Sequence, residues 1–260
     1  MKKKISSLGL VLFFLVFSSS AVFAAEETGK VSVEDSGTSE IIDPENPTNP
    51  ADPGEGPATE GALRIDYISS LNFGLENLSA PNRQYNSLAQ LFFDETTARG
   101  YFIQVSDFRP DDKWELQLTQ KTQFSSSIIQ DLNNQELKGA VLSFDNGWAN
   151  TNGTSDAPLV TRDAVALKSL DMAYTIATAG TNEGKGTWTI AFGSSESNPQ
   201  GKPATLSPLK DTQGNAVINK QYNKPEFKNS AISMTIPKET KIYPVEYSTT
   251  LTWTLLAGPN

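Results

Sequence analysis

The sequence predicts an all-β fold: an antiparallel β-sandwich with long irregular rim loops, preceded by a signal peptide and a disordered, acidic, proline-rich linker. Two observations support this prediction. Residues 62–260 contain many short segments in which apolar and polar residues alternate, and turn-forming residues separate these segments. Helical periodicity is scarce, and only residues 125–138 are compatible with one short helix. The 199 residues from position 62 onward are enough to bury a substantial core.

Eight segments carry the period-2 alternation that is typical of strands with one buried face. They are residues 63–67, 101–105, 114–118, 140–144, 170–176, 188–192, 232–236 and 247–255. Two polar stretches, 146–163 and 194–229, lack strong periodicity, and we interpret them as the irregular rim loops. Antiparallel sheets of this kind usually keep one face in contact with water.

Residues 1–24 are interpreted as a secretory signal peptide. Lys2, Lys3 and Lys4 give a positive start, an apolar run covers residues 8–17, and Val22-Phe23-Ala24 is a small-residue cleavage site. The apolar run is short for a bilayer span. A retained membrane anchor is the alternative interpretation. Removal of this segment leaves a secreted, extracellular chain for which no membrane span is expected.

Residues 25–61 are interpreted as a disordered linker. They contain ten acidic residues and one basic residue, Lys30, and prolines recur at every third position from Pro44 to Pro53. A segment with this charge and little apolar content is not expected to bury enough surface to offset its ordering entropy. The proline spacing predicts an extended polyproline-II spacer. The domain would then comprise residues 62–260.

Composition excludes several kinds of chemistry. The chain has no histidine and no cysteine, so a Ser-His-Asp triad, a cysteine nucleophile and a zinc site of the usual ligands are excluded. Carboxylate chemistry is not excluded, but neither a raised pKa nor a fixed carboxyl separation is visible in a sequence. We therefore expect no enzyme activity, no catalytic residue, no metal and no cofactor.

The charge of the chain argues against nucleic acid as a partner. Removing the three lysines of the signal peptide leaves 18 basic residues against 30 acidic ones, a formal net charge of −12. Phosphate binding requires clustered lysine and arginine, which this chain lacks.

The absence of cysteine also favours a bacterial exported protein over one matured in an oxidising eukaryotic compartment.

Two Trp-x-Leu segments stand out among the predicted strands. The first includes Trp114 and Leu116, and the second includes Trp253 and Leu255 near the C-terminus. We predict that these two strands are neighbours in one sheet. Two interpretations of the tryptophans are open. They are core residues, or they form a surface platform for sugar rings or a partner protein. Trp148, after the turn at Asp145, is the tryptophan that we expect to be partly exposed.

The residues resemble the WxL-domain surface proteins of low-GC Gram-positive bacteria. The resemblance covers residues 62–260 and depends on several short motifs taken together. These are residues 61–66 leading to 71–74, Trp114-Glu115-Leu116 with Gln117-Leu118, residues 136–140, Gly186-Thr187-Trp188 with Phe192-Gly193, and the terminal segment 247–255. The stretch 194–229 is longer and more irregular than the family pattern, which leaves the ligand of this chain open.

The resemblance implies a cell-surface protein that is attached non-covalently to the cell wall through peptidoglycan or another wall polymer. It also implies membership of a surface adhesion complex with other wall-associated proteins. Carried over by position, Trp114, Leu116, Trp253 and Leu255 are the wall-binding or partner-binding motif. The alternative is a structural subunit that binds another wall-associated protein rather than peptidoglycan.

Overall fold

The computed structural model describes residues 22–26, 39–74, 83–110 and 113–258. These ranges contain sixteen strands and a single 3-10 turn, η1 (Leu132–Asn134). The strands are β1 (Val22–Glu26), β2 (Leu63–Ile68), β3 (Gln84–Leu88), β4 (Tyr101–Asp107), β5 (Trp114–Gln120), β6 (Val141–Phe144), β7 (Gly147–Asn150), β8 (Leu159–Val160), β9 (Val165–Leu167), β10 (Ala173–Ala179), β11 (Gly186–Phe192), β12 (Leu206–Pro208), β13 (Ile218–Asn219), β14 (Lys224–Pro225), β15 (Phe227–Thr235) and β16 (Leu251–Ala257).

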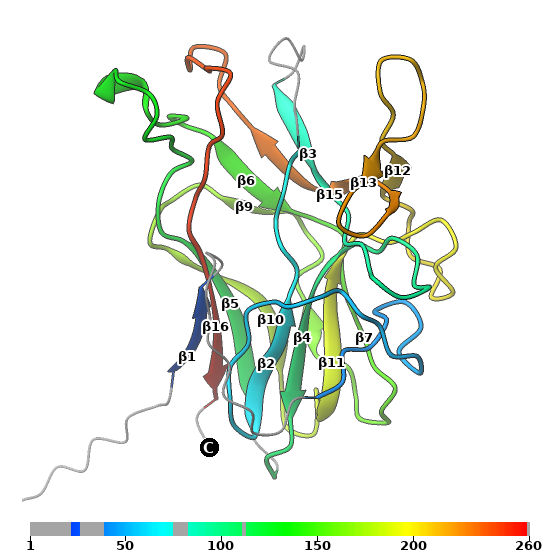
Figure 1. Ribbon diagram of the computed structural model, residues 1–260. Coiled ribbons are helices and arrows are strands. Elements are labelled where there is room, and N and C mark those ends of the chain that lie inside the picture. Colours follow the sequence, from blue (N-terminus) through cyan, green and yellow to red (C-terminus); the bar gives the residue numbers. More distant parts are fainter. Residues whose placement is uncertain (1–21, 27–38, 75–82, 111–112, 259–260) are drawn as a thin grey trace, which may run out of the picture.

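The strands form three main antiparallel sheets and one small hairpin, β13–β14 (Figure 1). The first sheet has the order β1-β16-β5-β10-β8, and we call it the motif sheet because it contains both Trp-x-Leu segments. The second has the order β2-β4-β11-β7. The third has the order β12-β15-β6-β9, with β3 also paired to β15. The predicted all-β, antiparallel fold of packed sheets is confirmed.

The three sheets share one hydrophobic core. Phe144 of β6 lies at their junction, because its ring contacts Phe192 of β11 at 5.1 Å and Trp253 of β16 at 6.0 Å between centroids. Tyr101 of β4 also stacks on Trp253, at 6.1 Å. Aromatic pairs at these separations add to the stabilisation that comes from buried area. The junction therefore ties the C-terminal strand to both neighbouring sheets.

A segment before the first domain strand covers the outer face of the second sheet. We call residues 39–53 the strap. Ala51 and Ile41 of the strap pack with Phe102 and Trp148, which belong to a second, smaller hydrophobic cluster on that face. All seven residues of β4 are consequently buried. Both faces of this sheet are covered, whereas the sequence predicts that one face is in contact with water.

The prediction of a disordered linker over residues 25–61 is wrong for residues 39–61, which the structure describes as packed chain. The strap also does not form an extended polyproline-II spacer. Ile42 bridges Pro50, and the Asp43 N–H donates to the Asn49 carbonyl at 3.0 Å, so the chain folds back on itself. Residues 27–38 of the predicted linker and residues 1–21 of the predicted signal peptide lie outside the described residues.

Trp148 is the most exposed of the four tryptophans, but at 5 % it is still buried, so the expectation that it is partly exposed is wrong. Its indole N–H donates to the Gly193 carbonyl at 3.0 Å, and the Lys202 ammonium lies over its ring at 5.7 Å. The strap and the loop after β11 together cover this side chain. The expected helix over 125–138 is reduced to η1, since Asp131 caps a single turn.

Candidate functional site: the paired motif strands

The two Trp-x-Leu segments are adjacent antiparallel strands, as the sequence analysis predicted (Figure 1). The register places Leu255 opposite Leu116 and Trp253 opposite Leu118, without a bulge. Trp114 lies opposite Ala257, so the two indoles are four positions apart along the pair. At about 3.4 Å per residue, this offset is roughly 14 Å. The motif is therefore one continuous structural element that is built from the two distant segments.

The motif side chains belong to the core. Leu116, Leu255 and Trp253 are fully buried, and Trp114 is 2 % exposed. Burial of a tryptophan removes about 150–250 Å² from water, which is worth about 4–6 kcal/mol at 25 cal/mol per Å². Of the two interpretations left open by the sequence, this burial supports the core role. The motif side chains do not form an exposed platform.

The two indole N–H groups have different environments. The Trp114 Nε1 donates to the Gly184 carbonyl at 3.3 Å. The Trp253 Nε1 is buried and has no hydrogen-bond partner within the described residues. A buried donor without a partner reduces stability, so the Trp253 indole is stabilised by the packing of its ring and not by a hydrogen bond from Nε1.

Gly184 lies directly against the Trp114 ring. Its φ is +62°, and a Cβ added there would lie 2.7 Å from Trp114 Cζ2. Gly186 also has a positive φ, +81°, but a Cβ there would meet nothing within 4 Å. We predict that Gly184→Ala lowers the free energy of unfolding by more than Gly186→Ala, whose cost is the backbone strain of about 1–3 kcal/mol. Urea unfolding of both variants checks this, and equal costs would contradict the packing of Gly184 on Trp114.

The opposite face of the motif sheet is polar. Thr254 of β16, Gln117 of β5 and Thr175 of β10 lie in one row across the three strands. Thr175 is exposed and the other two are partly exposed. Glu115 lies beside this row and accepts hydrogen bonds from Gln117 Nε2 at 3.0 Å and from Thr175 Oγ1 at 2.5 Å. The face therefore presents hydroxyl, amide and carboxylate groups on a regular sheet, and these groups suit a polar ligand.

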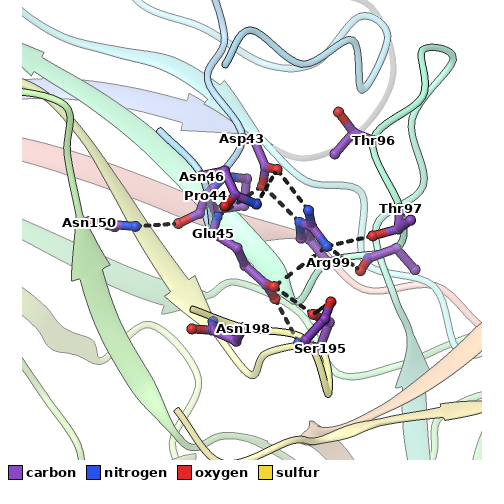
Figure 2. Close-up of polar contacts among 12 residues, drawn as sticks. Asp43, Pro44, Glu45, Asn46, Thr96, Thr97, Arg99, Asn150, Ser195 and Asn198 are labelled. Carbon is purple, nitrogen blue, oxygen red and sulfur yellow. Dashed lines mark hydrogen bonds and ion pairs between the residues drawn. The ribbon is translucent and has the colours of Figure 1, made fainter. Parts of the chain in front are cut away.

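A second cluster, which the sequence analysis missed, fixes the strap to the domain (Figure 2). Arg99 donates to both carboxylate oxygens of Asp43, from Nε and Nη2, each at 2.7 Å. The Arg99 Nη1 lies 3.5 Å from Glu45 Oε2. Glu45 also accepts from the Ser195 backbone N–H at 2.6 Å and from the Ser195 hydroxyl at 2.5 Å. All three charged side chains are at least 94 % buried.

The electrostatics of this cluster favour its charged form. Burial alone would raise the pKa of Asp43, but hydrogen bonds from Arg99, the Glu45 N–H and Asn46, with the positive charge of Arg99, lower the pKa overall. Burial would lower the pKa of Arg99, but Asp43 and Glu45 outweigh it and raise the pKa. The ion pair thus holds the strap as a charged, bidentate contact.

One sequence signal could have indicated the strap. Within the predicted linker, residues 25–61, Ile41 and Ile42 are the only adjacent pair of large apolar residues. Ile42 is buried, and its N–H donates to the Gln104 side chain at 2.9 Å. Acidic residues next to such a pair are candidates for buried ion pairs rather than for a solvated spacer.

The fold is an all-β domain in which two distant Trp-x-Leu segments become neighbouring strands of one sheet. The C-terminal strand β16 supplies the second of these segments, and this arrangement defines the class of domain. The sequence model of a WxL domain, described as a surface cell wall-binding domain, matches residues 22–259. The chain belongs to the WxL domain family. No curated protein and no solved structure matches the chain.

The family assignment confirms a cell-surface protein with a cell wall-binding domain. In the described part of the chain, no helix has the length and apolar content needed to cross a membrane. Among the same residues, no group of three or more aspartates and glutamates is arranged to hold a metal ion. Whether Trp114, Leu116, Trp253 and Leu255 take part in wall attachment stays a prediction.

Proposed function

We propose that this chain is a secreted protein that binds peptidoglycan non-covalently through the polar face of the motif sheet, as part of a surface adhesion complex. The observation that carries the proposal is that the two faces of β5 and β16 differ: one is buried and apolar, and the other is polar and partly exposed. The tryptophans and leucines of the motif face the core, while Thr254 and Gln117 face outward. The motif is then required because it builds the sheet that presents these polar side chains.

The chemistry of this face fits a glycan. Threonine hydroxyls donate and accept hydrogen bonds, and the Gln117 amide does both at once. Sugar hydroxyls and N-acetyl groups have the same mixed character. The row of Thr254, Gln117 and Thr175 repeats at the regular spacing between strands, about 4.8 Å. An extended polymer can therefore contact several strands in succession.

The test is retention on purified wall sacculi stripped of protein. We predict that the triple variant Thr175→Ala, Gln117→Ala and Thr254→Ala binds at least about tenfold more weakly, since each lost hydrogen bond contributes roughly 1 kcal/mol. These side chains lie outside the core, so the thermal unfolding temperature should change little. Co-sedimentation over a range of sacculus concentrations measures the affinity.

A matched control removes the same residue types elsewhere. Thr154, Thr212 and Gln213 are exposed and lie outside the motif sheet. Their triple alanine variant should bind sacculi as the unchanged protein does. Equal binding by both triple variants would reject the polar face as the wall contact.

A second candidate function is that of a structural subunit that binds another wall-associated protein. The observation favouring it is β1, a short strand that pairs with the edge of β16. This edge therefore accepts an added strand. In this case stripped sacculi would not retain the chain, and a partner protein would restore capture.

A further inference from the structure

The outer edge of β16 is occupied by a strand that overlaps the predicted signal peptide. β1 pairs with β16 in antiparallel register over five residues, from Val22 opposite Leu256 to Glu26 opposite Thr252. Cleavage after Ala24 would remove three of these five residues. The part of β16 that carries the second motif would then lose most of its neighbour on this side.

The backbone groups exposed by that cleavage belong to the motif residues. Just before β16, the Thr250 carbonyl accepts from the Lys121 N–H at 2.8 Å, so Thr250 points its polar groups toward the chain of β5. Along an antiparallel pair, this orientation alternates from residue to residue. The even-numbered residues of β16 therefore face β5. Trp253 and Leu255 direct their N–H and C=O groups toward the β1 side.

The edge of β16 carries none of the usual features that prevent strand addition. Its sequence contains no charged residue and no proline. Its pairing with β1 and with β5 is continuous, without a bulge. An unprotected edge with free N–H and C=O groups is a template for another strand. After cleavage, Leu255 would lack a strand partner, and the partner of Trp253 would be the new N-terminal residue, Ala25.

We propose that the β16 edge of the processed chain binds an extended strand from another surface protein. The incoming strand would run antiparallel to β16 and carry apolar residues opposite Trp253 and Leu255, whose side chains face the core. In the unprocessed chain β1 occupies this position in register and pairs with no other strand among the described residues. This indicates that the edge accepts a segment from outside the folded domain. The inference deepens the second function proposed above and depends on the predicted signal cleavage.

Cross-linking tests the register directly. The probe is a synthetic peptide of residues 18–28 with cysteine in place of Ala24, which lies opposite Thr254. The chain starting at Ala25 has no cysteine, so Thr254→Cys introduces a single thiol. Directly opposed residues of an antiparallel pair are close enough for a disulfide. We expect at least tenfold more cross-linked product than with Thr175→Cys, a matched position on the same face of β10. Equal cross-linking would overturn the proposal.

Hydrogen exchange at β16 provides a second, independent readout. In the processed chain, the Leu255 amide should exchange rapidly and become protected when the peptide is added. The amides of Thr254 and Leu256, which face β5, should be protected in both states. Protection of Leu255 without peptide would overturn the proposal. If that protection were independent of protein concentration, the chain's own N-terminal segment would fill the edge, and if it rose with concentration, a second copy would.

These measurements use no wall material. Failure of the sacculus assay therefore leaves the edge proposal standing, and failure of the cross-linking assay leaves the proposed peptidoglycan contact standing.

Discussion

Replacement of Trp253 by alanine is expected to lower the free energy of unfolding by about 3–5 kcal/mol, the usual cost of deleting a buried tryptophan. The side chain is fully buried, stacks on Tyr101 and meets Phe144 edge to face, so its loss opens a cavity at the junction of the three sheets. For a domain of this size, the unfolding temperature should fall by roughly 10 °C. Urea and thermal unfolding followed by circular dichroism measure both quantities.

Phenylalanine at the same position separates ring packing from the indole N–H. Trp253→Phe keeps an aromatic ring and removes a buried donor that has no partner within the described residues. Trp114→Phe instead removes the hydrogen bond to the Gly184 carbonyl. We therefore expect Trp114→Phe to cost more than Trp253→Phe, by about 1 kcal/mol. The reverse order would contradict the assignment of the two indole environments.

The same variants test what the motif does at the wall. If the tryptophans act only by building the sheet, the folded fraction of Trp253→Phe should bind sacculi as well as the unchanged protein. Weak binding by a fully folded Trp253→Phe variant would contradict this purely structural role. Binding must therefore be measured below the unfolding transition of each variant.

The strands were predictable where one side of the segment is apolar. The alternation in residues 63–67, 101–105 and 114–118 identifies β2, β4 and β5, because one residue in two must enter the core. Residues 170–172 show the limit of this reasoning. Leu170 and Met172 continue the pattern but are 46 % and 53 % exposed, since β10 begins only at Ala173. Periodicity alone does not show where a strand ends.

The pairing of β5 with β16 was predicted from the repeated Trp-x-Leu motif rather than from periodicity. The strands are more than 130 positions apart, and alternation contains no information about which strands become neighbours. The role of the motif side chains was left open for a related reason. A tryptophan on an apolar strand face has the same local pattern whether it is covered or exposed.

The strap was not predictable from composition. Its acidic residues suggest a solvated spacer when each charge is counted by itself. Asp43 and Glu45 are instead buried and paired with a single arginine, Arg99, that lies more than 50 positions away. A long-range ion pair of this kind leaves no periodic signal in the sequence. The strap covers the outer face of β4, so the burial of this face was not predicted either.

Replacement of Arg99 by methionine is expected to release the strap. The variant would leave Asp43 and Glu45 as two buried carboxylates without a cation, which typically costs about 3–5 kcal/mol. Because the strap covers Trp148, its release should expose this indole to solvent. Limited proteolysis within residues 39–53 and tryptophan fluorescence measure the release, and urea unfolding measures the cost.

Two controls distinguish the buried charge from the lost side chain. The triple variant Arg99→Met, Asp43→Asn and Glu45→Gln removes all three charges and should be more stable than Arg99→Met alone. Lys121→Met breaks a surface ion pair with Asp171, 3.3 Å apart, in which both side chains are well exposed, and should cost less than about 1 kcal/mol. An Arg99→Met variant as stable as Lys121→Met would show that the cluster does not hold the strap.

The pH dependence of the strap has a definite sign. The pKa of Asp43 is lower in the folded chain than in the unfolded chain, because Arg99 and the neighbouring donors outweigh the effect of burial. Its contribution is therefore present above the unfolded pKa, about 3.9, and is lost as the pH falls through the lower, folded value. Proteolysis of the strap by an acid-active protease should accelerate below about pH 4 in the unchanged protein. The triple variant, which has no charge to titrate in the cluster, should show a weaker acceleration over the same range, and an equal one would place the acid sensitivity elsewhere.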